Sequence, residues 1–187
     1  LVFDAVGITA NVYINGALAG SHIGAYTSFN VPISRYLNFS DEGTSKNQVI
    51  VVADNSYSED ILPLSADFTF FGGIYRDVHI AALEKVHFKM DKYNSKGVFW
   101  TSPVVSHESA ELQLDGAFSN SSKKAVKVRV EHILLDMQGQ EVLRKEKKYA
   151  GKSGETVDFS CQLHLKNPRL WSPEDPYLYR LISMLMV

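Results

Sequence analysis

The stretch Val157-Asp158-Phe159-Ser160-Cys161-Gln162-Leu163-His164-Leu165-Lys166 decides the fold class, because every second residue in it is apolar. Successive side chains of a β-strand point to opposite faces of a sheet. The alternation therefore predicts a strand with one core face and one solvent-exposed face. Val126 to Glu131 repeats the pattern, with valine at 126, 128 and 130 and charged residues between them. We expect an all-β protein.

Strand signals continue towards the N-terminus. In Gln48–Asp54 nearly every residue is apolar, which is typical of a strand covered on both faces. Asn11–Ile14 runs into Asn15-Gly16, a dipeptide that tolerates the positive φ angles of a tight type I′ hairpin. Tyr75–Leu83 reads as a further strand, and nothing before it shows a convincing 3.6-residue period.

The length of 187 residues suits one large domain or two small ones. Between about residue 82 and Gly97 the pattern loosens into a charged stretch, which we interpret as a connection between domains 1–83 and 84–187. The second of these has the size of an immunoglobulin-like sandwich, without the Cys–Trp–Cys mark of antibody domains. Within it, Asp136–Glu141 reads as a hairpin turn, with Gly139 available for positive φ.

Composition excludes several classes of protein. Nineteen basic residues against 21 acidic ones give a net charge of −2, so we expect no nucleic-acid partner. No apolar run approaches the roughly 18 residues of a membrane span, so we expect no membrane partner. The single cysteine, Cys161, rules out an internal disulfide and a cysteine-based zinc cluster. It leaves the cellular compartment open.

Catalytic motifs are missing from the sequence. It has no G-x-S-x-G elbow, H-E-x-x-H, Walker loop or G-x-G-x-x-G. Cys161 lies in the apolar register of its strand, so we expect a buried and inert thiol rather than a nucleophile. Gly72-Gly73 is explained by close backbone packing or a bulge. Six histidines are scattered without metal-ligand spacing: His22, His79, His87, His107, His132 and His164.

Aromatic and acidic residues leave alternatives open. Trp100 and Trp171 could stack on sugar rings, but their strand and proline-turn contexts favour a core or interdomain role. Asp67 is different from the other acids because it lies among aromatics before two glycines, where it either caps a loop or faces a cleft. Three adjacent carboxylate pairs are interpreted as solvated turns: Asp41-Glu42, Glu59-Asp60 and Glu174-Asp175.

The string Phe70–Val78, FFGGIYRDV, closely resembles the segment that ends the N-terminal sugar-binding domain of glycoside hydrolase family 2, the family of β-galactosidases, β-glucuronidases and β-mannosidases. Upstream segments are similar to that domain in the same order, although Gly24-Ala25 replaces its usual Gly-Gly. The signature that closes the family's immunoglobulin-like second domain is matched downstream. The matching segments are NVYING at 11–16, GSH at 20–22, GAYTSF at 24–29, VVADN at 51–55, PRLWSP at 168–173 and PYLY at 176–179.

The resemblance implies a galactose-binding-like jelly-roll sandwich, truncated at its N-terminus, followed by an immunoglobulin-like β-sandwich. Roughly six strand candidates before residue 83 are fewer than an eight-stranded jelly roll needs, so we expect an unpaired edge or an exposed core face. The implied parent is a retaining exo-glycosidase, a β-galactosidase of bacterial carbohydrate use. Its two catalytic glutamates would lie on a third, (β/α)₈ domain, and the acid/base glutamate would follow an asparagine. This sequence contains no Asn-Glu pair, so we expect no catalytic residue in it.

The family pattern assigns a role to few residues of this chain. In family β-galactosidases the loop before the I-Y-R-D-V strand reaches the mouth of the barrel, and Asp67 matches the acid there that holds the sugar. Asp67 is therefore the predicted substrate-binding residue. Arg76 and Asp77 are interpreted as a structural pair, and His22 as a turn histidine.

We expect no cofactor and no metal site. We expect carbohydrate to be met through the catalytic domain of the parent. The compartment of that parent is open, with the periplasm and secretion as options, and so is whether the full-length enzyme forms a homo-oligomer. Two other hypotheses remain: a stand-alone carbohydrate-binding module of two sandwiches, and a structural β-sandwich pair without a ligand.

Overall fold

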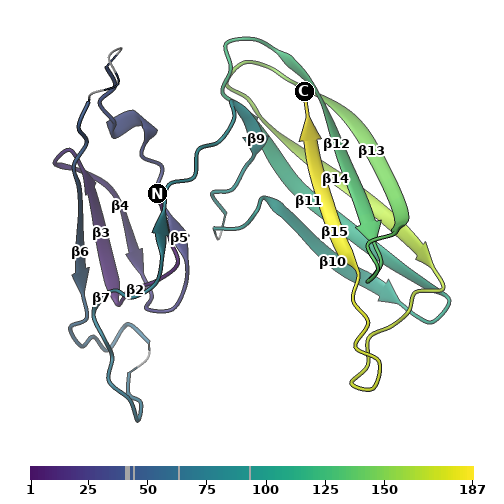
Figure 1. The fold of residues 1–187 in the computed structure, drawn as a ribbon, viewed down its shortest axis with the longest axis horizontal. Helices are drawn as coiled ribbons and strands as arrows, with labels where there is room; N and C mark the ends of the chain where they lie inside the picture. The colour runs from purple at the N-terminus through teal and green to yellow at the C-terminus, as the bar shows by residue number, and fades with distance from the viewer. Residues whose placement is uncertain (41–42, 44, 63, 93) are drawn as a thin grey trace. The chain divides into compact units, whose positions relative to one another are not determined.

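The computed structural model describes residues 1–40, 43, 45–62, 64–92 and 94–187. The fold is all-β, as predicted, and its described residues form a single helical turn, the 3₁₀ turn η1 (Ser34–Tyr36). None of the described helices is long and apolar enough to cross a membrane. The chain divides into two compact units, Leu1–Ala82 and Leu83–Val187, and most of their strands are labelled in Figure 1. The predicted turn at Asp41-Glu42 lies outside the described residues.

The first unit contains three small antiparallel sheets. Their strand orders are β5-β1-β8, β2-β7 and β4-β3-β6. Most of these strands are only two residues long. The strands are β1 (Val2–Phe3), β2 (Val6–Gly7), β3 (Thr9–Ile14), β4 (Ala17–Ile23), β5 (Phe29–Asn30), β6 (Val49–Asp54), β7 (Gly73–Ile74) and β8 (Val78–His79).

The hairpin between β3 and β4 forms as predicted. Asn15 and Gly16 both have positive φ, 50° and 82°, which is the requirement of a type I′ turn. Asn15 also fastens the turn to the rest of the unit, because its side-chain nitrogen donates to the Tyr36 carbonyl at 2.8 Å.

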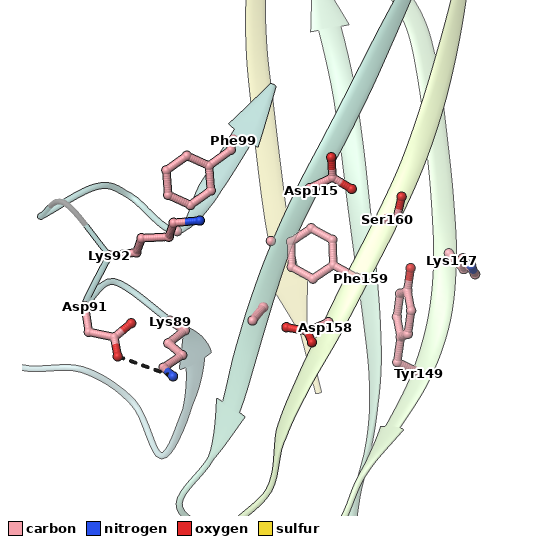
Figure 2. Close-up of a pocket in the computed structure, with 13 residues that line it drawn as sticks. Lys89, Asp91, Lys92, Phe99, Asp115, Lys147, Tyr149, Asp158, Phe159 and Ser160 are labelled. Atoms are coloured by element: carbon pink, nitrogen blue, oxygen red, sulfur yellow. Dashed lines mark ion pairs between the residues drawn. The ribbon is translucent and has the colours of Figure 1, made fainter. Parts of the chain in front are cut away.

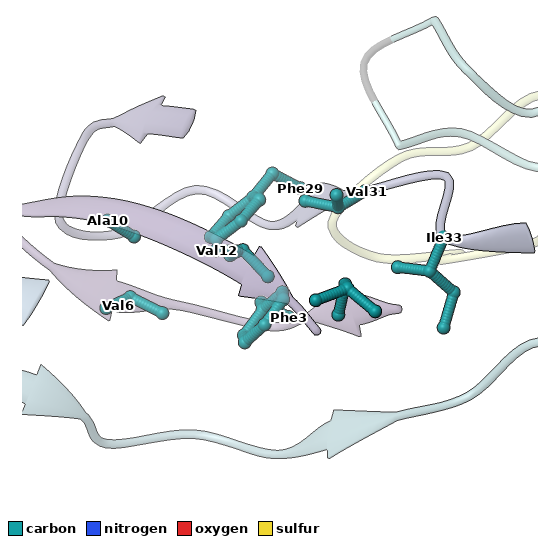
Figure 3. Packing of buried hydrophobic residues seen from close by; sticks show 8 residues of the cluster. Phe3, Val6, Ala10, Val12, Phe29, Val31 and Ile33 are labelled. Carbon is teal, nitrogen blue, oxygen red and sulfur yellow. The ribbon is translucent and has the colours of Figure 1, made fainter. Parts of the chain in front are cut away.

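A core of eight buried residues holds the three sheets together (Figure 3). Phe3 and Phe29 stack at its centre, with ring centroids 4.7 Å apart. Val12 and Ile14 reach the same core from β3 because alternate residues of a strand share one face.

One prediction for β6 is confirmed and another is wrong. The strand forms, but neither of its faces is fully covered, and Ile50 and Val52 are 44% and 50% exposed. Val51 and Ala53 pack against the core, whereas nothing in the described part of the chain buries Ile50 and Val52. The near-continuous apolar run therefore overstated the burial of the strand. The first unit carries the exposed apolar face that its low strand count had suggested.

The strand predicted over Tyr75–Leu83 is mostly wrong. Only Val78–His79 pairs there, as β8, and its partner β1 is itself only two residues long. A ladder cannot extend past the end of its partner strand. Ile80 is accordingly 73% exposed and lies outside any strand.

The second unit is a sandwich of two sheets. One has the order β10-β11-β14, with β9 pairing the far end of β11, and the other has the order β13-β12-β15. The sheets face each other across Phe118 and Phe159 on one side and Val128 and Val130 on the other. The strands are β9 (Val86–Phe88), β10 (Val98–Val105), β11 (Ser109–Asn120), β12 (Val126–Leu135), β13 (Glu141–Gly151), β14 (Thr156–Lys166) and β15 (Arg180–Met186).

The alternation that predicted this sandwich agrees with its burial. Along β14, Phe159, Cys161, Leu163 and Leu165 are buried, and the polar residues between them are exposed. The predicted turn between β12 and β13 also forms, with Gly139 at φ 79°. The interpretation of residues 84–97 as a plain connection is wrong in part, because β9 lies within them and pairs with β11.

Candidate functional site

Asp67 lies on an exposed loop between β6 and β7. The structure shows no hydrogen bond or ion pair from the other described residues to its carboxylate. The rings of two aromatic neighbours, Phe68 and Phe70, contact each other edge to face with centroids 5.5 Å apart, and Phe68 is 59% exposed. Asp67 thus does not cap the loop, and its role in substrate binding stays a prediction.

The glycine pair after this loop has a structural explanation, as expected. A Cβ on Gly72 would lie 2.8 Å from the side chain of Asn55, and Gly73 has φ 88°. The Asn55 amide donates to the Phe70 carbonyl at 3.1 Å and fastens the loop to the end of β6. Close packing and a left-handed backbone therefore require glycine here.

Arg76 and Asp77 connect their segment to its neighbour, as their structural interpretation expects, but through the main chain and not through an ion pair. Among the described residues neither side chain forms an ion pair. The Arg76 guanidinium lies 5.5 Å from the centre of the Tyr75 ring, and the Asp77 carbonyl accepts a hydrogen bond from the Asp4 N–H at 3.0 Å. The main chain, and not the two charges, connects this segment to its neighbour.

His22 lies near the end of β4, paired with Ala10 of β3, so its interpretation as a turn histidine is wrong, although its contacts are structural. Its ring stacks on Phe29 with centroids 4.2 Å apart, and its Nε2 lies 3.0 Å from Thr27 Oγ1. Burial of the ring lowers the pKa of His22. In the turn after β4, Gly24 takes the positive φ of 133°, and Ala25 is buried where the Tyr75 hydroxyl donates to its carbonyl. The Gly-Ala sequence is therefore accommodated.

Cys161 is inert for physical reasons. It is 7% exposed beside Leu114 and Leu163 in the core of the second unit. Burial raises the pKa of the Cys161 thiol above its ordinary value, so the reactive thiolate is scarce near neutral pH. The expected structural role of this cysteine is confirmed.

Trp100 and Trp171 line one pocket of about 950 Å³ in the second unit. Their exposed fractions are 59% and 58%, so the possibility of a core role is wrong. Met137 and Leu178 line the same pocket and are also largely exposed. An apolar pocket of this kind can receive an apolar or ring-shaped group, and its position could not be inferred from two tryptophans 71 positions apart.

The segment that carries Trp171 is held by its own contacts. Arg169 binds the Asp175 carboxylate through Nε at 2.8 Å and Nη2 at 2.7 Å, and its guanidinium lies over the Tyr177 ring. This hydrogen bonding lowers the pKa of Asp175. The turn at Glu174-Asp175 is therefore exposed but not simply solvated, whereas Glu59-Asp60 is an exposed turn as expected.

The lining of the tryptophan pocket supplies no pair of carboxyl groups. The one acid that lines the tryptophan pocket is Asp136, whose Oδ1 accepts from the N–H groups of Gln138 and Gln140 at 2.9 and 2.8 Å. Glycoside hydrolysis needs two carboxyl groups facing one bond. No group of three or more histidine, cysteine, aspartate or glutamate residues is placed to hold a metal within the described part of the chain.

Comparison with known families assigns both units. The family profile described as "Glycosyl hydrolases family 2, sugar binding domain" matches residues 1–84, and the profile "Glycosyl hydrolases family 2" matches residues 96–186. The chain belongs to glycosyl hydrolase family 2. The resemblance of the FFGGIYRDV segment and its companions is thereby confirmed.

Relatives of this family 2 chain are much longer than it is. A β-glucuronidase of Bacteroides fragilis is 35% identical over 97% of this chain and 25% of its own length. A β-galactosidase of Bacteroides ovatus is 30% identical over 98% of this chain and 20% of its own length. The crystal structure of a Bacteroides uniformis β-glucuronidase matches with a TM-score of 0.89 and 37% identity, over 98% of this chain and 21% of that one. This family 2 chain thus spans about a fifth to a quarter of such proteins.

Proposed function

We propose that this chain is the non-catalytic N-terminal region of a retaining family 2 glycosidase, in which it supports a catalytic domain. The observation that carries the proposal is the match of two profiles of one family to consecutive stretches of the chain. We assign residues 1–83 to the sugar-binding-like jelly-roll domain and 84–187 to the immunoglobulin-like domain. The division of the structure between Ala82 and Leu83 supports these boundaries.

Support for the glycone of the whole enzyme comes from the relatives and not from the chain's own chemistry. Those at 35–37% identity described above are called β-glucuronidases, and this favours a β-glucuronide as the substrate. The β-galactosidase expected from the sequence is the second candidate, supported by the Bacteroides ovatus enzyme at 30% identity.

The glycone is tested with the full-length gene product. Its kcat/KM is measured on p-nitrophenyl β-D-glucuronide and on p-nitrophenyl β-D-galactoside under the same conditions. We expect a preference of at least about a hundredfold for the glucuronide, because a site built for a carboxylate leaves buried charge unpaired with a neutral sugar. The reverse preference would make the enzyme a β-galactosidase. If neither substrate were hydrolysed, both candidate glycones would be overturned.

Within this proposal Asp67 binds the sugar in the cleft of the catalytic domain. Its exposed carboxylate, to which no other described residue binds, supports the assignment, since its two oxygens can accept hydrogen bonds from sugar hydroxyls. In the full-length enzyme, Asp67→Ala should lower kcat/KM by about ten- to a hundredfold, mainly through KM. Asp60→Ala, an exposed acid in the preceding turn, is the matched control and should stay within twofold of wild type. A D67A enzyme with unchanged kcat/KM would remove Asp67 from the site.

A further inference from the structure

A hollow of about 880 Å³ lies on the second unit, lined by residues between Lys89 and Ser160 (Figure 2). It does not involve the tryptophan pocket. Part of its lining is the outer face of the sheet formed by β10, β11 and β14. Phe159 of β14 and Tyr149 of β13, which also line it, belong to the core cluster between the two sheets. The β-strand register determines which side chains meet there.

Two adjacent rows of side chains cross the three strands. In the first row, Phe99 of β10 pairs with Asp115 of β11, which pairs with Ser160 of β14. The Gln113 side-chain nitrogen donates to Asp115 Oδ1 at 3.0 Å and to Ser160 Oγ at 2.7 Å, so both acceptors are held in place. This row presents a ring, a carboxylate and a hydroxyl on one exposed surface.

The second row has a small side chain at its central position, and this produces the hollow. Ala117 occupies the central position, opposite Asp158 of β14. On its other side the Lys89 N–H donates to the Ala117 carbonyl at 2.8 Å, which sets Lys89 at that edge. A methyl group between two long side chains leaves a depression, which has the Phe99 ring on one side and the Asp158 carboxylate on the other.

Lys89, Asp91 and Lys92, which follow β9, form a wall of the hollow. Lys89 Nζ lies 3.3 Å from Asp91 Oδ2, and Lys92 Nζ lies 5.2 Å from the centre of the Phe99 ring (Figure 2). Gly97, just before β10, lies close to Lys89. Its φ is 82°, and a Cβ on it would lie 2.8 Å from the Lys89 carbonyl oxygen. Glycine is therefore required at position 97, where the chain returns next to Lys89.

The chemistry of the lining selects a class of ligand. Three lysines and three aspartates line the hollow, with Lys89 and Asp91 joined in an ion pair, so their charges balance and give a phosphate-rich ligand no net attraction. Carboxylate oxygens accept hydrogen bonds from hydroxyl groups, and the apolar face of a pyranose ring suits an aromatic face. The volume falls in the range of small-ligand pockets and exceeds that of one sugar ring. A ligand rich in hydroxyls fits better than an apolar or a polyanionic one.

We propose that this hollow is a saccharide-binding site, in which a pyranose ring stacks on Phe99 above Ala117 and its hydroxyls bind Asp115 and Asp158. The site belongs to the second unit alone and goes beyond the role of supporting a catalytic domain. A ligand carboxylate, as in a uronic acid, would bind the ammonium group of Lys92 at the edge of the ring. A neutral sugar would use the ring and the aspartates only.

The test is a titration of the ¹⁵N-labelled 187-residue chain, followed by two-dimensional amide spectra. The probes are methyl β-D-galactopyranoside and methyl β-D-glucuronide, each raised to about 100 mM. We expect saturable shifts at residues 97–99, 115–117 and 158–160, with dissociation constants on the order of millimolar, as exposed shallow sites give. If the uronate arm binds more tightly, Lys92→Gln should remove only that advantage.

Variants separate this site from others on the surface. Phe99→Ala should raise the dissociation constant by about tenfold or more, and Ala117→Gln should do the same by filling the floor of the hollow. The two substitutions are independent, so a folding defect in one leaves the other decisive. Thr101→Ala is the matched control, because Thr101 pairs with Gln113 on the same face one row away and does not line the hollow.

The outcomes are decisive in both directions. Saturable shifts at the hollow that F99A and A117Q abolish, and T101A leaves intact, support the site. No shifts with either sugar at about 100 mM, or shifts centred on the tryptophan pocket, overturn it. The result does not depend on whether the full-length enzyme prefers a glucuronide or a galactoside.

Discussion

The two units reach similar fold classes with different amounts of internal support. The second unit has strands of up to 12 residues, and its two sheets enclose three clusters of buried residues. The first unit has one core cluster, and most of its strands have two residues. Its β6 is a well-formed strand with exposed Ile50 and Val52. The comparison teaches that apolar sequence predicts a strand well and predicts its burial only where a second layer exists.

The largest expected difference between the units comes from matched deletions in their cores. Phe3 and Phe118 are both fully buried, and replacing either with alanine should cost about 3–5 kcal/mol. We expect Phe118→Ala to lower the unfolding midpoint of the second unit while it stays folded. Phe3→Ala should unfold the smaller-cored first unit outright, because the loss is comparable to the whole stability of a small domain.

The two tryptophans allow the units to be followed separately. Both lie in the second unit, so tryptophan fluorescence in urea reports its unfolding, and hydrogen exchange of the β3 amides reports the first unit. Retained β3 protection in F3A would contradict the ranking of the two cores. An equal shift of the urea midpoint in F3A and F118A, followed by tryptophan fluorescence, would also contradict this ranking.

A smaller effect should appear with pH, and in the second unit it should come from His132. His132 is 2% exposed, with Nδ1 2.8 Å from Ser183 Oγ, and burial lowers its pKa. The unfolded chain, with an ordinary histidine pKa near 6.5, therefore binds a proton that the folded chain does not. Stability should be complete above about pH 6.5. It should fall as the pH drops towards the lowered value, by about 1.4 kcal/mol per unit of separation.

The measurement is the free energy of unfolding of the second unit at pH 7 and at pH 5. His132→Gln should remove part of this pH dependence. His164→Gln should preserve it, because His164 is an exposed histidine on β14. An identical pH dependence in wild type and H132Q would contradict the assignment to His132.

The smallest effect is expected on the exposed face of β6. Val52→Thr should change the unfolding free energy of the isolated chain by less than about 0.5 kcal/mol, because Val52 is 50% exposed. Val51→Thr, one residue earlier on the face that packs against the core, should cost about 1 kcal/mol or more for placing a hydroxyl against apolar side chains. Equal costs for the two substitutions would show that both faces of β6 are covered.

The sequence predicted those features that depend on local pattern. Alternation predicted β14, and Asn15-Gly16 predicted the hairpin, because each is determined by a few neighbouring residues. Burial of polar residues was missed where it depends on a partner across the sheet. Glu131 was expected to be exposed and is 6% exposed, because Arg144 binds its Oε1 at 2.7 Å.

The candidate sites show the same limit. Asp67 could be singled out from its aromatic neighbours and from the family pattern, since both are continuous in sequence. The hollow beside Phe99 depends on register across three strands, which brings Ala117 between Lys89 and Asp158. A single sequence does not specify that register, so only the structure brings these residues together.

The central claim, that this chain is the non-catalytic part of a glycosidase, is tested most directly by a side-by-side hydrolysis assay. The 187-residue chain and the full-length gene product are compared for release of p-nitrophenol from the β-D-glucuronide and the β-D-galactoside. The account predicts saturable hydrolysis by the full-length protein and a rate equal to buffer for the chain alone. Saturable hydrolysis by the chain alone would contradict it.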